Sequence, residues 1–108
     1  MTRKQLVQAG SGNVFEDLKV QAADEFLAKS QLAVRIFKVI RSRRLTQAAA
    51  GKLLGINQPK VSALLNGRLD GFSTDRLFRF LTTLGCDMRI SVSQPHPRTR
   101  GQVEIVAG

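Results

Sequence analysis

The sequence predicts a mainly α-helical domain of about five helices that ends in a C-terminal β-strand or hairpin. Up to Gly85, apolar residues recur at helical spacing, and capping residues and glycines stand at the ends of the apolar stretches. After Gly85 the apolar and polar residues alternate strictly, which is typical of a half-buried strand. At 108 residues, the chain has the length of one domain.

The first clear helix is predicted over residues 24–43. Two acidic residues open it, where they interact favourably with the free N–H groups of a helix start. Its apolar residues follow helical spacing and predict one buried stripe. That stripe consists of Leu32, Ile36, Phe37 and Ile40.

Two short helices are predicted next, on either side of a three-residue turn. Thr46 caps the first of them, which ends at Gly55, where we expect a positive φ. Asn57 caps the second, and Asn66-Gly67 ends it. A further helix begins at Ser73 or Thr74 and stops at Gly85.

Three regions follow from these patterns. Residues 1–13 are predicted to form a flexible N-terminal arm, because they contain a Gly-Ser-Gly-Asn stretch. Residues 14–85 form the helical domain. Residues 86–108 form the strand or hairpin, in which residues 87–93 alternate and residues 102–106 offer a second short strand.

The net charge of +9 is the main indication of function. Its excess lies between Phe26 and Leu69, a segment with nine basic residues and no acidic one. Such a region attracts a polyanion, so nucleic acid is the leading partner and an acidic protein the alternative. The nine residues are Lys29, Arg35, Lys38, Arg41, Arg43, Arg44, Lys52, Lys60 and Arg68.

The two short helices have the pattern of a helix-turn-helix. The helices can cross closely only where the contact residue is small, and Gly51 meets that need. Val61 and Leu64 are predicted to face inward on the second helix, which leaves Gln58 and Lys60 on its polar outer side. A helix-turn-helix places its second helix in the major groove of DNA.

The segment resembles the helix-turn-helix of the Cro/C1-type (XRE) regulators, the family of the phage repressors with the lambda-repressor-like bundle. The match runs from Thr46-Gln47 through Gly55, Gln58, Val61 and Leu64 to Asn66-Gly67. Residues 13–18, 60–67 and 86–92 are similar to a narrower subgroup of small antitoxins of host-inhibition-type toxin–antitoxin systems. The resemblance implies a double-stranded DNA operator, a homodimer and a cognate toxin protein as partners.

The resemblance also implies which residues contact DNA. Gln47 would bind a phosphate, Gln58 would read adenine, and Lys60 would reach a guanine or a phosphate. Pro59 and Ala63 stand where relatives carry polar base readers, so part of the specificity would come from DNA shape. The full predicted set is Gln47, Asn57, Gln58, Pro59, Lys60, Ser62, Ala63, Asn66 and Arg68.

The predicted strand is also the expected dimerisation element, because an open strand edge pairs with a second copy. Met88, Ile90 and Val92 would lie at its centre. A dimer through helical Phe78 or Phe80 is the alternative.

These features favour an autoregulating repressor over two other classes. The alternatives are a protein that mainly neutralises a toxin, and one that binds RNA or DNA without sequence preference. Enzyme, metal and cofactor chemistry is not expected, since the chain has only His96 and Cys86 as candidates. A cytoplasmic location is expected, because there is no secretory N-terminus and no apolar run near the ~20 residues of a membrane span.

Overall fold

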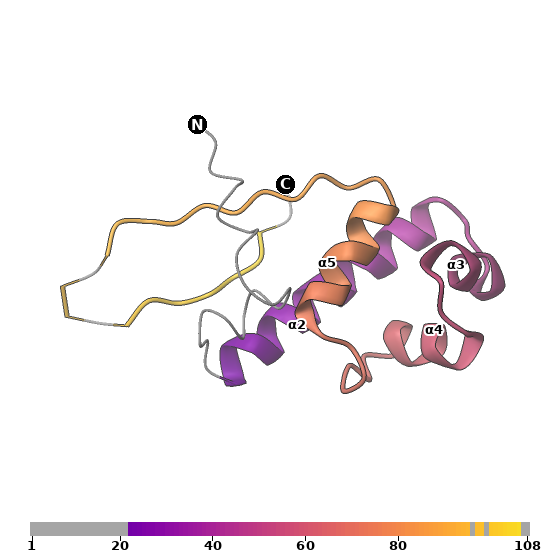
Figure 1. Cartoon of the computed structure of the whole chain (residues 1–108), viewed down its shortest axis with the longest axis horizontal. Coiled ribbons are helices and arrows are strands. Elements are labelled where there is room, and N and C mark those ends of the chain that lie inside the picture. The colour runs from indigo at the N-terminus through magenta and orange to yellow at the C-terminus, as the bar shows by residue number, and fades with distance from the viewer. Residues whose placement is uncertain (1–21, 96, 99, 107–108) are drawn as a thin grey trace.

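The computed structural model describes residues 22–95, 97–98 and 100–106. Within them the chain forms four helices in sequence order (Figure 1). Their bounds are Ala22–Ser42 for α2, Gln47–Leu54 for α3, Gln58–Leu65 for α4 and Thr74–Thr83 for α5. All four lie where the sequence predicts helices. The predicted N-terminal arm and any helix before α2 lie outside the described residues.

Helix α2 is the longest element and passes behind α5 in Figure 1. The predicted stripe is confirmed for Leu32, Ile36 and Ile40, which are buried. It is wrong for Phe37, which is 38% exposed. At 3.6 residues per turn, Phe37 points about 100° away from Ile36 and misses the seam. Its ring instead lies under the guanidinium of Arg41, whose Cζ is 5.8 Å from the centroid of the Phe37 ring.

One hydrophobic core joins the four helices. Helices α2 and α5 pack along each other, and their buried side chains include Leu32, Ile36 and Leu77. Helix α4 contributes Val61 and Leu64 to the same cluster. The first turn of α4 is exposed, whereas Ser62, Ala63 and Leu65 are half-buried.

The crossing of α3 and α4 depends on a missing side chain. A Cβ on Gly51 would lie 2.7 Å from the Ile56 carbonyl oxygen and 3.2 Å from Cγ2 of Val61, so only glycine fits. The chain then turns at Gly55, whose φ of 75° is left-handed as predicted. These two glycines together allow α4 to start immediately beside the end of α3.

Side-chain caps define the helix starts as the sequence predicts. Thr46 accepts a hydrogen bond from the N–H of Ala49 at 3.0 Å, and Asn57 accepts one from Lys60 at 2.9 Å. For α5 the capping residue is Ser73 rather than Thr74, and it accepts from Arg76 at 3.1 Å. Each cap satisfies an N–H that has no partner within the helix.

The predicted C-terminal hairpin is wrong for a single copy of the chain. No strand is formed within residues 86–95 and 100–106, and the two arms of this segment run well apart in Figure 1. Each arm packs on the helices instead, through Met88 in one and Ile105 in the other. The Ile105 N–H also donates to Gln31 Oε1 on α2 at 3.0 Å. An isolated two-stranded hairpin is only marginally stable in water. Pairing of the two arms would therefore stabilise the chain less than these contacts with the helices do.

Replacing Gly51 with alanine should destabilise the domain, although alanine is the better helix former. Forcing an atom against the Ile56 carbonyl costs about 1–3 kcal/mol. Helix propensity returns at most roughly 1 kcal/mol. We expect the free energy of unfolding, measured by urea denaturation, to fall by about 1 kcal/mol and by no more than about 3 kcal/mol.

Gly101→Ala is the matched control, because a Cβ at Gly101 meets no atom within 4 Å. Its free energy of unfolding should stay within about 0.5 kcal/mol of the wild-type value. A Gly51→Ala variant as stable as the wild type would mean that α3 and α4 can separate without cost.

Candidate nucleic-acid interface

The outer side of α4 is the centre of the candidate interface. Asn57, Gln58, Pro59 and Lys60 form its first turn, and all four are exposed. The carboxamide oxygen of Asn57 is used by the cap, so this residue orients the turn. A helix whose N-terminal turn is polar and exposed has the geometry of one that enters a DNA groove.

The other exposed contact residues that the sequence predicts lie at the start of α3 and beyond the end of α4. Gln47 is exposed at the first position of α3, directly after its cap. Asn66 and Arg68 are exposed beyond the C-terminal end of α4. The amide of Asn66 donates to the Ser62 carbonyl at 2.8 Å and to the Ser62 hydroxyl at 3.3 Å, so it closes the last turn of the helix.

Two predicted base readers are less accessible than the rest. Ser62 is half-buried and bonded to Asn66. Ala63 is half-buried and packs against the core. The structure therefore brings the nine predicted residues onto one helix-turn-helix unit, but it exposes seven of them and half-buries these two.

Lys60 does not extend straight out from α4. Its Nζ lies 5.7 Å from the ring centroid of Phe72, in the loop between α4 and α5. The same ring has a second cation, the guanidinium of Arg76, at 5.6 Å. The exposed first turn of α4 is therefore linked to the start of α5 through the Phe72 ring.

A family model for a helix-turn-helix domain matches residues 14–93 of the chain. The matched range includes all four described helices and most of the chain. The chain belongs to the helix-turn-helix domain family.

A solved structure supports a finer assignment within this family. Its name assigns it to the XRE family of transcriptional regulators, and it is 44% identical in sequence with a TM-score of 0.75. The match covers 82% of this chain and 100% of the other. No curated protein matched the chain. The protein is an XRE-type helix-turn-helix regulator, a class of DNA-binding proteins that are typically not enzymes.

In this regulator, one basic residue of the acid-free segment has a structural role. The sequence places Arg43 only among the nine basic residues of that segment. In the structure its Nη1 donates to the Leu84 carbonyl at 3.0 Å, which ties the end of α2 to the end of α5. The two residues are 41 positions apart, so sequence spacing offers no signal for this bond.

Arg76 lies beside the candidate interface and is not among the residues that the sequence predicts there. Phe72 and Phe80 lie four residues before and after it, and its Cζ is 5.6 Å from the centroid of each ring. That i, i+4 aromatic–arginine–aromatic spacing is the signal that could have identified it.

The candidates for other chemistry are few in the regulator. Within the described ranges, no group of three or more His, Cys, Asp or Glu side chains could hold a metal ion. His96 lies outside those ranges. Cys86 is half-buried with a free thiol. In the part of the chain that the structure describes, no helix is long and apolar enough to cross a membrane.

Proposed function

We propose that the regulator is a sequence-specific repressor that inserts α4 into the DNA major groove. The observation that carries this proposal is the exposed first turn of α4, held by its Asn57 cap while Val61 and Leu64 anchor the opposite side in the core. The acid-free basic segment adds an electrostatic attraction that does not depend on sequence. A repressor bound at its own operator would also regulate its own operon.

The proposed contacts are of two kinds: contacts that read base edges, and backbone contacts that position the protein on the duplex. Gln58 reads a base, because its amide offers a donor and an acceptor to adenine N6 and N7. Pro59 provides an apolar contact for a thymine methyl. Gln47, Asn66 and Arg68 contact the sugar–phosphate backbone and set the register.

Replacing Gln58 with alanine should remove a base contact without a general loss of DNA binding. The operator is first selected by the wild-type protein from a pool of random duplexes. On that operator, Gln58→Ala should cost about 1–3 kcal/mol of binding free energy and relax preference at one base pair. On an unrelated duplex, Gln58→Ala should lose little binding free energy. Fluorescence anisotropy titrations measure both affinities.

Gln47→Ala is the comparison, because a phosphate contact supports every sequence alike. It should weaken the operator and the unrelated duplex by the same factor. Equal losses on both duplexes for both variants would remove Gln58 as a base reader. Failure to enrich any sequence from the pool would favour the alternative of binding without sequence preference.

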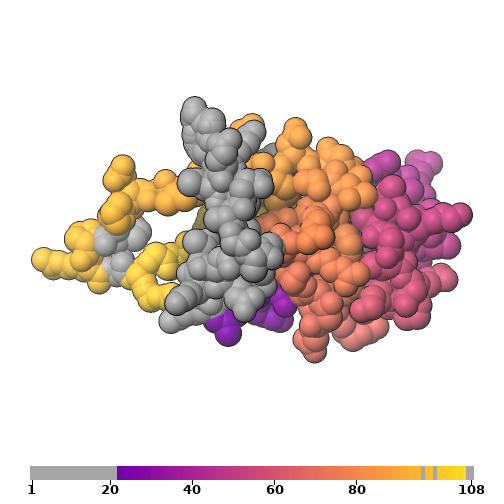
Figure 2. Space-filling view, viewed as in Figure 1, coloured from indigo at the N-terminus to yellow at the C-terminus, as the bar shows by residue number. Residues whose placement is uncertain are grey.

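We propose that the regulator acts as a homodimer through residues 84–106. One helix-turn-helix contacts too little DNA for strong specificity, and dimers reach half-sites about 34–36 Å apart. The two arms of this segment border an open cavity of about 1630 Å³ together with α2 and α5 (Figure 2). Val92 is 79% exposed on one arm. Extended chain with exposed apolar residues is suited to pairing with a second copy.

Ile90→Asp should convert the regulator into a monomer. Ile90 is half-buried at the centre of the alternating stretch, and a carboxylate there would oppose burial between two copies. Sedimentation velocity should give the mass of one chain, and operator affinity should be lost. Ser91→Asp, the same charge change at the adjacent exposed residue, should remain dimeric. A dimeric Ile90→Asp variant would point to the alternative interface at Phe78 or Phe80.

We infer a second function, neutralisation of a toxin protein, from an apolar surface on α2. Phe26, Val34 and Phe37 form an exposed stripe along this helix, and Phe26 is 65% exposed. Val34 and Phe37 line a small groove with Leu65 and Leu69. Exposed apolar surface of this kind is typical of protein-binding sites. The net charge of +9 favours an acidic partner.

Co-expression with the product of the adjacent gene tests this function. The regulator should co-purify with that product and relieve its growth inhibition. Val34→Asp should abolish co-purification, because it places a charge in the apolar contact. Thr83→Asp, at an exposed residue of α5, should retain it. Loss of co-purification in both variants, or in neither, would exclude the α2 stripe as the binding surface.

A further inference from the structure

Four residues form a cluster between α4 and α5, here called the Phe72 cluster: Lys60, Phe72, Arg76 and Phe80. The two rings meet edge to face with their centroids 6.0 Å apart. Both are buried, with Phe72 only 3% exposed. A cation over an aromatic face is attracted to the ring's electrons, so the rings give both cations a preferred position.

Among the described residues, the two cations have no carboxylate partner in an ion pair. In the described part of the chain, neither Lys60 nor Arg76 is within ion-pairing distance of an acidic side chain, although Asp75 is the immediate neighbour of Arg76. Asp75 instead pairs with Arg79 at 2.6 Å, one turn further along α5. The same helix therefore carries one arginine that is neutralised and one that is not.

The cluster places two positive charges from different helices around one rigid ring. Lys60 enters from the first turn of α4, and its Nζ lies 3.7 Å from where a Cβ of Gly71 would stand. Arg76 enters from the first turn of α5 and is half-buried. Both cations therefore lie at the loop between α4 and α5, 5.7 and 5.6 Å from the same ring centroid and beside the exposed first turn of α4. Arginine and lysine are the common donors to DNA phosphates.

We propose that Lys60 and Arg76 form a clamp for the DNA backbone phosphates beside α4, with Phe72 as the residue that positions both cations. This assigns Lys60 to phosphate rather than to a guanine edge, and it adds Arg76 and Phe72 to the DNA interface. The proposal rests on the proposed function, because it requires that α4 approaches duplex DNA. Since a phosphate contact is independent of sequence, any duplex serves as the ligand.

The test compares two arginines of the same helix. Wild-type protein, Arg76→Gln and Arg79→Gln are titrated onto a short fluorescein-labelled duplex of mixed sequence at several KCl concentrations. Both variants lose the same formal charge. A lost phosphate contact lowers the magnitude of the log–log salt slope by about 0.9 per bound protomer. Between about 50 and 200 mM salt, the affinity of Arg76→Gln should then fall about 3.5-fold less than that of the wild type.

Arg79→Gln should keep the wild-type slope, because Arg79 is already paired with Asp75. Lys60→Gln should lower the slope as Arg76→Gln does, and the double variant should show the sum. A slope that Arg76→Gln leaves unchanged, or that both arginine variants lower equally, would overturn the clamp. If the wild-type protein did not bind the duplex at all, the proposed function itself would fail.

Phe72→Leu tests the positioning role, since it keeps both charges and an apolar side chain. Its slope should fall towards that of the Lys60→Gln/Arg76→Gln variant. In that double-variant background, Phe72→Leu should change the slope no further. A purely structural role for Phe72 would leave the slope at the wild-type value and alter only thermal unfolding, which circular dichroism measures on the same samples.

Discussion

The close approach of α3 to α4 at Gly51 sets the geometry on which the DNA-binding face depends. With no Cβ at that position, the Ile56 carbonyl and the Val61 side chain can come directly against α3. The left-handed Gly55 then allows the chain to reverse in a short turn. As a result, Val61 and Leu64 reach the core while the first turn of α4 stays exposed. A larger contact residue would rotate or displace α4, and its polar side would no longer be presented in the same way.

Helices α2 and α5 hold the α3–α4 unit in place, and α5 also contributes side chains to the surface beside α4. They pack along each other, and the Arg43–Leu84 hydrogen bond joins their C-terminal ends. Helix α5 also brings Phe80 and Arg76 to the loop beside α4. The surface near Lys60 is therefore built by two helices and the loop between them, and core packing and surface charge depend on the same aromatic rings.

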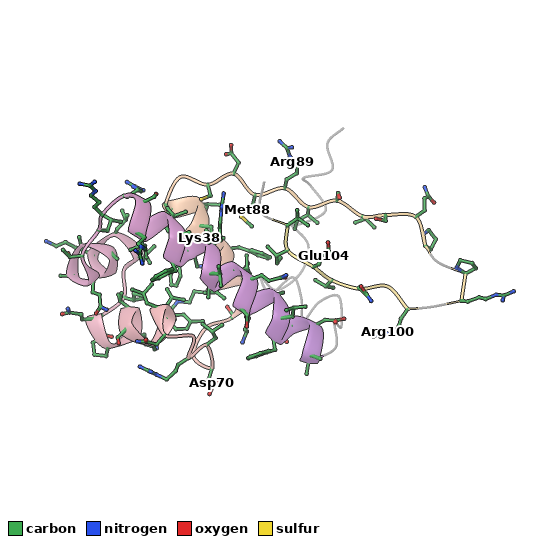
Figure 3. All side chains as sticks on the ribbon, turned by 180° about the vertical axis from the view of Figure 1, so that it is seen from behind. Lys38, Asp70, Met88, Arg89, Arg100 and Glu104 are labelled. Atoms are coloured by element: carbon green, nitrogen blue, oxygen red, sulfur yellow. The ribbon has the colours of Figure 1, made fainter. Side chains whose placement is uncertain are left out.

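The proposed DNA-binding surface and the proposed dimerisation segment lie on different parts of the molecule. Helices α3 and α4 are at one end in Figure 1, and the C-terminal arms extend at the other. Figure 3 shows the alternation on one arm, where Met88 is directed towards the helices and Arg89 away from them. Because of this separation, association of two copies through the arms need not compete with DNA whose groove is occupied by α4. A repressor that is both dimeric and bound to DNA requires such an arrangement.

The sequence by itself determined the helix boundaries, the caps at Thr46 and Asn57, the turn at Gly55 and the inner side of α4. These features depend on residues within a few positions of each other, so spacing and residue type are sufficient to predict them. The tertiary structure decided that Phe37 lies outside the core, that Arg43 binds Leu84, and that the C-terminal arms lie on the helices instead of pairing. It also decided that Lys60 and Arg76 meet at Phe72. Each of these outcomes depends on the direction in which one element crosses another, which brings together residues that are far apart in the chain and have no common pattern in the sequence.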